Sequence, residues 1–326
     1  MRNIWSQLAL KSKPFLALAP MDGVTDYVFR EVIAGVGKPD VFVTEFINTE
    51  ALCSQGYEKT IHRFRYSEKQ RPIVAQIWGK EPRNFFTVAK LIRELQFDGI
   101  DINMGCPVRD VMKMGCGAQL INTPQLADTI IAAVKEGAPD FPVSVKTRIG
   151  VKTIVTDDWI RFLLRQHIQA ITIHGRTAKE LSKTPTHWDE IGKAVKLRDQ
   201  YAPDTVIIGN GGVVTSIQAK QVSSLYGVDG VMIGTGIFQN PWLFEKQSKK
   251  HTVRDSLRLL LTHAKLYADV YPGDGRFAPM KKFFKIYVRN FSGASALMKQ
   301  LMEAKRLSEV ESLVMPYLVE PRGVLT

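Results

Sequence analysis

Short apolar runs alternate with longer amphipathic segments along the first 245 residues. Several runs are rich in β-branched residues and almost continuously apolar, which is typical of parallel strands buried on both faces. The intervening segments, such as 83–95, 124–135 and 157–167, place apolar residues at helical spacing. The expected strands span 15–19, 41–45, 73–77, 100–103, 143–147, 170–174, 206–210 and 230–233.

Eight consecutive strand–helix units predict an α/β fold of the (β/α)₈ TIM-barrel type. Strand patterns stop after residue 245. Segments with apolar residues at helical spacing then follow at 254–271, 277–292, 294–303 and 306–318. We therefore expect a TIM-barrel catalytic domain in residues 1–245, followed by a small C-terminal helical bundle domain in residues 246–326.

The composition is that of an ordinary globular protein, with 45% hydrophobic and 23% charged residues. No apolar run reaches the length of about 18 residues that a membrane span needs, and residues 1–7 lack the apolar core of a signal peptide. Cys53, Cys106 and Cys116 are odd in number and lack metal-ligand spacing. We therefore expect free thiols, no metal site, no membrane contact, a cytoplasmic location and a monomer.

The formal net charge of +12 favours a polyanionic partner, because such a field attracts and steers polyanions. The charge is uneven along the chain. Residues 245–326 hold 15 Lys and Arg against 8 Asp and Glu, whereas the three-times-longer remainder holds 29 against 24. A merely solubilising surface is the alternative explanation.

Polar residues and glycines gather where the expected strands end. In a TIM barrel these ends share the C-terminal rim, where the active site lies. The sequence therefore predicts one site built from several strands. The residues concerned are Pro20, Met21 and Asp22 after the first strand, Gln76 in the third, Asn103 and Cys106 after the fourth, Lys146 and Arg148 at the fifth, His174 and Arg176 at the sixth, Asn210 to Gly212 at the seventh, and Gly234 to Gly236 at the eighth.

Cys106 is the candidate reactive group. It is preceded by Asn103 and Gly105 and followed by Pro107, which cannot extend a central strand. The thiol is therefore expected past the strand end, at the barrel mouth. The alternative is a small buried hydrophobe, the usual state of a cysteine.

The two glycine-rich loops at 210–212 and 234–236 close the seventh and eighth strands. TIM barrels commonly bind phosphate at this place, through backbone N–H groups that glycine leaves accessible. The pattern indicates a phosphorylated cofactor.

Motifs along nearly the whole chain resemble those of the flavin-dependent tRNA-dihydrouridine synthases. The resemblance implies an FMN-dependent, NADPH-driven reduction of a uridine in tRNA. The motifs are 18–21 (LAPM), 74–76 (VAQ), 101–107 (DINMGCP), 114–120 (MGCGAQL), 145–148 (VKTR), 173–177 (IHGRT), 209–212 (GNGG), 233–236 (IGTG) and 240–244 (NPWLF).

The resemblance also implies roles for single residues. Cys106 would be the general acid that protonates uracil C5, while flavin N5 delivers a hydride to C6. Lys146 would stabilise negative charge on the reduced ring, and Gln76 would bond its pyrimidine edge. Pro20, Met21 and Asp22 would lie against the ring, His174 would contact the ring or ribityl chain, and Asn210, Gly211, Gly212, Gly234 and Thr235 would hold the phosphate. Asn103, Arg148 and Arg176 would face the tRNA substrate.

Lys281, Lys282, Lys285 and Arg289 form a further candidate site. On a continuous helix over 277–292 they would fall within one arc of roughly 100°. No acid interrupts them, so the sequence predicts a tRNA-binding stripe. The alternative is a solvated face of a bundle helix.

Four other interpretations stay open at the level of sequence. Lys146 can form a structural ion pair, and His174 can be a satisfied core histidine. The protein can be an FMN barrel oxidoreductase acting on a small pyrimidine, of the dihydroorotate dehydrogenase kind, which would not need the basic helical domain. It can also be a non-catalytic tRNA-binding protein, which would not need Cys106.

Overall fold

A computed structural model of the chain describes residues 3–247, 249–273 and 277–319. The chain divides into two compact units, which we call the barrel unit (residues 1–27 and 39–236) and the helical unit (residues 28–38 and 237–326). This division falls before the expected boundary at 245 and assigns residues 28–38 to the helical unit. Of the expected domain 246–326, positions 248, 274–276 and 320–326 lie outside the described residues.

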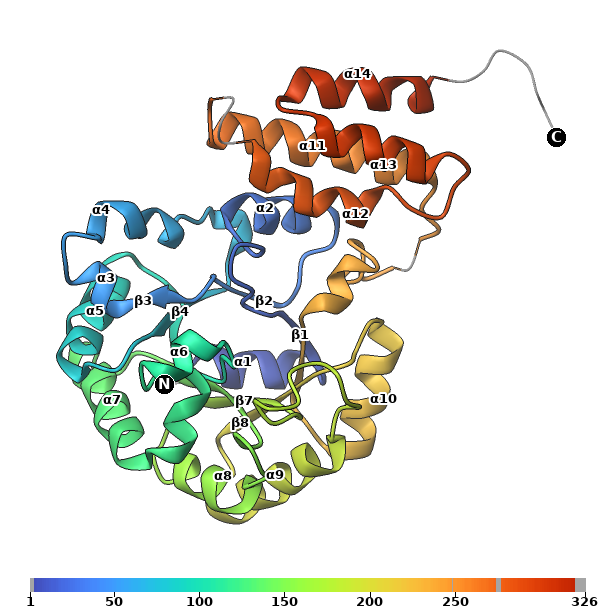
Figure 1. The fold of residues 1–326 in the computed structure, drawn as a ribbon. Coiled ribbons are helices and arrows are strands. Elements are labelled where there is room, and N and C mark those ends of the chain that lie inside the picture. Colours follow the sequence, from blue (N-terminus) through green and yellow to red (C-terminus); the bar gives the residue numbers. More distant parts are fainter. Residues whose placement is uncertain (1–2, 248, 274–276, 320–326) are drawn as a thin grey trace. The chain divides into compact units, whose positions relative to one another are not determined.

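The barrel unit is a closed parallel (β/α)₈ barrel, which confirms the predicted fold (Figure 1). The pairing of β2 with β4 closes the sheet, while β1 lies between β2 and β9. A two-residue strand, β3 (Ile47–Asn48), pairs with β4 and was not predicted. The barrel strands are β1 (Phe15–Leu18), β2 (Val41–Val43), β4 (Ile73–Trp78), β5 (Gly99–Met104), β6 (Val143–Arg148), β7 (Ala170–His174), β8 (Val206–Asn210) and β9 (Gly230–Ile233).

The helices around the barrel follow the amphipathic pattern of the sequence. Their apolar faces are buried, as at Val88 and Ile92 of α5. The helices are α5 (Pro82–Glu94), α7 (Pro124–Gly137), α8 (Thr156–Leu164), α9 (Trp188–Tyr201) and α10 (Ser216–Tyr226). Short helices α3 (Thr49–Leu52), α4 (Tyr57–Thr60) and α6 (Arg109–Lys113) lie in the loops.

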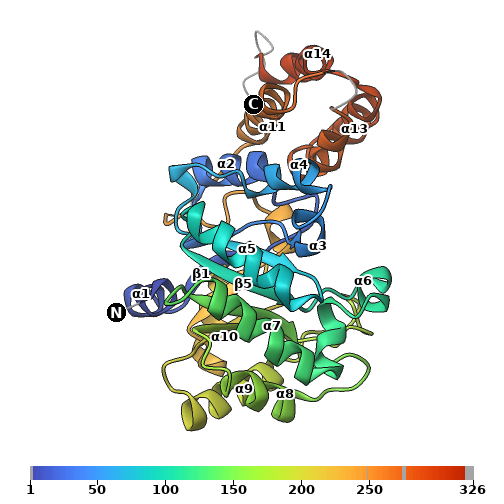
Figure 2. The same ribbon diagram turned by 90° about the vertical axis from the view of Figure 1, so that its left-hand side faces the viewer.

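An N-terminal helix, α1 (Ile4–Lys11), closes one end of the barrel. Its Trp5 and Leu8 pack in the same core cluster as Phe15 and other inward side chains of the strands. Figure 2 shows α1 at one end of the barrel and α6 at the opposite end. Since α6 follows the carboxyl end of β5, the end opposite α1 is the one left for a site.

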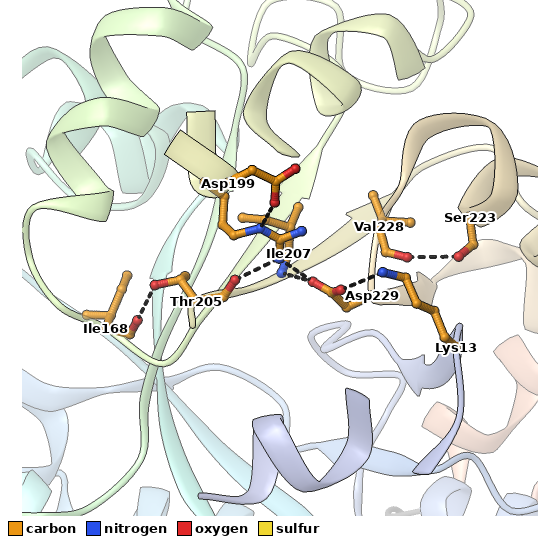
Figure 3. A network of polar contacts seen from close by, with 9 residues as sticks. Lys13, Ile168, Asp199, Thr205, Ile207, Ser223, Val228 and Asp229 are labelled. Atoms are coloured by element: carbon orange, nitrogen blue, oxygen red, sulfur yellow. Dashed lines mark hydrogen bonds and ion pairs between the residues drawn. The ribbon is translucent and has the colours of Figure 1, made fainter. Parts of the chain in front are cut away.

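A buried ionic network joins α9 to the starts of β8 and β9 (Figure 3). The Asp229 carboxylate accepts from Arg198 Nη1 at 2.6 Å, from Ile207 N at 2.9 Å and from Lys13 Nζ at 3.0 Å. Burial acts to raise the pKa of Asp229, but the Ile207 N–H and the Arg198 guanidinium outweigh it and hold the pKa below its usual range.

Replacing Asp229 with alanine should lower the free energy of unfolding by about 3 kcal/mol, because it leaves the Arg198 guanidinium buried without its main partner. Denaturant unfolding measures this loss. The carboxylate contribution is present above the unfolded pKa of about 4 and disappears as the pH falls through the lower folded value.

Asp199→Ala is the matched control for this experiment. Its carboxylate also bonds Arg198, at 2.6 Å, but is 64% exposed. Its loss should cost less than about 1 kcal/mol. Equal losses in the two variants would contradict the structural role of Asp229.

The helical unit contains α2 (Tyr27–Val36) from residue 28 onward, together with α11 (Val253–Val270), α12 (Phe284–Tyr287), α13 (Ala294–Glu303) and α14 (Leu307–Leu318). The first, third and fourth of the expected C-terminal helices are confirmed. A capping box between Thr252 and Asp255 fixes the start of α11. No helix in the described part of the chain is long and apolar enough to cross a membrane.

The expected continuous helix over 277–292 is wrong. Residues 278–283 form a 3₁₀ turn, α12 spans a single turn, and Val288 leaves the helix at φ −100° and ψ 86°. Five of the six residues from Phe283 to Val288 are buried, so this segment lacks the separate polar face on which the prediction of an amphipathic helix rested.

The arc calculated for the four cations therefore does not hold. Arg289 lies beyond the end of α12, and the Lys281 ammonium donates to the carbonyl of Met302 at 2.5 Å. Lys282 and Lys285 are exposed. These two are the members of the set that the structure leaves most available to a partner.

Candidate active site

A cavity of about 440 Å³ opens at the carboxyl ends of the barrel strands, within the volume range of small-molecule sites. It gathers nearly all the rim residues that the sequence predicted. Those that line it are Pro20, Met21, Asp22, Asn103, Cys106, Lys146, Arg148, His174, Arg176, Asn210, Gly211, Gly212, Gly234 and Thr235. Gln76 does not line the cavity, and the four cations at 281–289 belong to the helical unit.

The Cys106 thiol lies at the cavity wall and is only 8% exposed. Burial raises its pKa, while the Val108 N–H and the Arg148 charge oppose the shift. The group is therefore a thiol, not a thiolate, at neutral pH, and it can donate a proton without further activation.

A buried chain of hydrogen bonds supports the Cys106 loop. Ser144 Oγ donates to Asp101 at 2.6 Å, Gln76 Nε2 donates to the other Asp101 oxygen at 2.7 Å, and Asn103 Nδ2 donates to Gln76 Oε1 at 2.9 Å. Asn103 Oδ1 in turn accepts from Cys106 N at 2.9 Å. The chain exists because Gln76, Asp101 and Ser144 are register partners across β4, β5 and β6.

This chain accounts for the position of Gln76. Its amide is fully buried behind Asn103 and bonds a protein partner at each end. Asp101 was not singled out from the sequence, because a single acid in an apolar strand gives no local signal. Burial raises the pKa of Asp101 to about 6, against the hydrogen bonds from Ser144 and Gln76.

Lys146 carries a half-buried ammonium that reaches the cavity. Its Nζ donates to Asn210 Oδ1 at 3.1 Å, and among the described residues it forms no ion pair. Burial, followed by the charge of Arg148, lowers the pKa of Lys146 to about 8. A half-buried ammonium with one neutral hydrogen-bond partner fits a site that receives an electron-rich ligand.

His174 is neutral in this environment. Burial and then the charge of Lys146 lower its pKa to about 2. Its Nε2 lies 3.2 Å from Arg176 Nη1, and Arg176 Nε donates to the carbonyl of Thr184 at 2.7 Å.

Arg148 holds two loops together. Its Nε donates to the carbonyl of Gly105 at 2.8 Å, and its Nη1 donates to those of Thr177 and Leu181 at 3.1 and 3.2 Å. Arg148 is 6% exposed, and these N–H groups of its guanidinium donate to backbone carbonyls of the protein. Its main observed role is to position the Cys106 loop beside the loop after β7.

The glycine loop after β8 needs its glycines. Gly211 and Gly212 have φ angles of 128° and 73°, and a Cβ on Gly211 would lie 2.9 Å from the Thr186 side chain. Only glycine therefore lets Thr186 pack this closely against the loop, and the loop lines the cavity with backbone that carries no side chain at Gly211 and Gly212. This is the property that the sequence pattern predicted for a phosphate cradle.

Phe46, Ser182 and Val214 also line the cavity and were missed. Phe46 packs against the apolar cluster of Cys106, Val111 and Cys116. An apolar residue just after a strand looks like ordinary core in sequence, so no signal could have found it. Burial raises the pKa of Cys116 to about 11, which leaves it an inert apolar side chain.

Comparison with known proteins gives a consistent picture. A profile of the family described as "Dihydrouridine synthase (Dus)" matches residues 17–319. A Bacillus subtilis (strain 168) protein named "Probable tRNA-dihydrouridine synthase 2" is 44% identical over 315 residues, covering 96% of this chain and 95% of that one. A Staphylococcus aureus (strain MRSA252) protein named "Probable tRNA-dihydrouridine synthase" is 43% identical, covering 96% and 94%. A solved variant of NCR from Zymomonas mobilis aligns with 78% of this chain and 95% of its own at 14% identity, with a TM-score of 0.49.

Proposed function

The chain belongs to the dihydrouridine synthase family, and on that premise we propose that it reduces a specific uridine of tRNA to 5,6-dihydrouridine, with FMN as cofactor and NADPH as reductant. The observation that carries the proposal is one cavity that combines a protonated, buried Cys106 thiol with an ammonium and a glycine cradle. The family relationship favours this reaction over the oxidation or reduction of a free small pyrimidine.

The residues present fit FMN. The loop at 210–212 lines the cavity with backbone that carries no side chain at Gly211 and Gly212, and the loop at 234–236 lines the same cavity. Lys146 supplies a cation whose only described hydrogen-bond partner is neutral. We propose that these loops hold the phosphate, that Pro20, Met21 and Asp22 lie against the ring, and that Lys146 and His174 contact it.

Reduced FMN would supply the hydride to C6 of the uracil ring. The chain supplies the matching proton from Cys106 Sγ to C5, so that the C5=C6 bond becomes saturated. The Asn103 amide fixes the loop that carries the thiol, and Arg148 fixes the same loop from the Gly105 carbonyl. Together they set where the proton is delivered.

The substrate base must leave its stack to enter a cavity of this depth, as in other base-modifying enzymes. The chain's net charge of +12 favours the approach of tRNA. We propose that Lys282 and Lys285, with Lys281 and Arg289 near them in sequence, contact tRNA phosphates, and that the reaction takes place in the cytoplasm.

FMN should copurify with the protein. We expect a yellow preparation that releases FMN on denaturation, that NADPH bleaches without oxygen, and that unmodified tRNA reoxidises with formation of dihydrouridine. Heat-denatured protein with the same tRNA is the control. A colourless protein that FMN cannot reconstitute would contradict the cofactor assignment, and flavin that tRNA leaves reduced would contradict the substrate.

A further inference from the structure

A second hollow, of about 890 Å³, adjoins the active-site cavity. Pro107, the residue after Cys106, lines both. The hollow lies between α6 and the loops after β6 and β7, so all of it belongs to the barrel unit. We call it the side groove.

The side groove is lined by cations and by no carboxylate. Arg109, Lys113, Lys152 and Lys179 come from three separate segments of the chain. Lys113 forms a long ion pair with Asp110, at 3.9 Å, and both side chains are mostly exposed. Within the described ranges the other three cations form no ion pair. The groove therefore presents four cations that the protein does not neutralise strongly.

The floor of the side groove is apolar. Met112, Val151, Ala178 and Leu181 line it, and the Leu181 side chain stays 40% exposed. An exposed apolar floor between cations suits a nucleotide, whose base or ribose packs on the floor while its phosphate meets the cations.

The side groove and the catalytic loop share one support. Arg148 bonds the carbonyl of Gly105, just before Cys106, and the carbonyl of Leu181 on the groove floor. Backbone bonds from Ala178 N to Gly150 O and from Lys179 N to Val151 O, both 2.9 Å, fix the two groove loops to each other. The groove is thus held in a fixed place relative to the thiol.

We propose that the side groove binds the tRNA strand adjacent to the target uridine, with one neighbouring nucleotide on the apolar floor and its flanking phosphates on the four cations. This inference rests on the proposed function, because a uridine extruded into the cavity draws its neighbours across the rim at Pro107. The four cations favour a polyanion as the ligand of the side groove. Because Pro107 lines both the groove and the active-site cavity, that polyanion is expected to be the tRNA whose uridine enters the cavity.

The test compares two quadruple variants of equal charge change. The groove variant is Arg109→Gln, Lys113→Gln, Lys152→Gln and Lys179→Gln. The matched control removes one arginine and three lysines that are exposed on the outer helices: Lys90→Gln, Arg93→Gln, Lys196→Gln and Lys220→Gln. Binding of unmodified tRNA is measured by filter binding over a range of salt concentrations, and dihydrouridine formation gives KM and kcat.

The groove variant should bind tRNA at least about 30-fold more weakly, with a salt slope reduced by roughly 2.8 to 3.6, since each of the four lost phosphate contacts removes about 0.7 to 0.9. KM should rise in parallel, and flavin content and the KM for NADPH should stay unchanged. The tRNA affinity of the control variant should remain within about twofold of that of the wild type. Leu181→Asn tests the floor separately, since asparagine tolerates the positive φ of 56° at this position; it should weaken tRNA binding with no change in salt slope.

Equal tRNA affinity and salt slope in the groove variant and the wild type would overturn the proposal. A raised KM for NADPH with unchanged tRNA binding would overturn it as well and assign the groove to the reductant. If the wild type forms no dihydrouridine, the proposed function fails, but the binding comparison still decides whether the groove holds RNA.

Discussion

Replacing Cys106 with alanine is expected to lower dihydrouridine formation on tRNA by about 10²-fold or more, the usual effect of losing a general acid. Flavin content and the oxidation of NADPH should persist, because the thiol donates only to the nucleobase. Dihydrouridine in tRNA is quantified by mass spectrometry after a single turnover of the reduced enzyme. Cys106→Ser should be similarly impaired, because a hydroxyl is a far weaker acid than a thiol.

Cys116→Ala is the matched control for this loss. Cys116 is 2% exposed and packs in the same apolar cluster as Cys106, but it does not line the cavity. Its replacement should leave turnover close to that of wild type. Full activity of the Cys106 variants on unmodified tRNA would refute the general-acid assignment.

Replacing Lys146 with methionine is expected to slow flavin reduction by NADPH by about 10²-fold, the typical cost of removing one preorganised charge from a buried site. The Lys146 ammonium is half-buried in the cavity wall and bonds only Asn210 among the described residues. Methionine preserves the apolar stem, so the barrel should remain folded. Anaerobic stopped-flow bleaching of the flavin measures the rate.

The lowered pKa of Lys146 also predicts how the rate of flavin reduction changes with pH. The pKa of Lys146 is lowered to about 8, so the charged form is present below that pH and is lost above it. The wild-type rate should therefore fall as the pH rises through about 8, and the methionine variant should lack this step. Lys135→Met is the control: burial also lowers the pKa of Lys135, but it lies outside the active-site cavity. A pH profile of Lys146→Met that retains the step would assign it to another group.

Much of the barrel could be predicted from the sequence. All eight expected strands form, with three to six residues each, because nearly continuous apolar runs are typical of parallel strands buried on both faces. The closed parallel topology then brings the end of every strand to one rim. For this reason Cys106, Lys146 and the loops at 210–212 and 234–236 line one cavity although they lie far apart in the chain.

Side-chain partners and helix ends depended on the tertiary structure. The bonds that join Ser144, Asp101, Gln76 and Asn103 follow from the register of three strands, which no local pattern contains. Gln76 therefore supports the Cys106 loop from behind the cavity.

In the helical unit, too, the sequence pattern did not predict where a helix ends. The apolar spacing over 277–292 predicted one helix, but residues 278–283 form a 3₁₀ turn, α12 ends after one turn, and nearly every residue from Phe283 to Val288 is buried. The side groove likewise forms only when α6 and two distant loops meet. Local sequence determined which residues form strands and stand at their ends, because periodic burial is a property of neighbouring residues. Tertiary packing decided which of those side chains are in contact, because each contact joins segments that are distant in the sequence and that only the folded structure brings together.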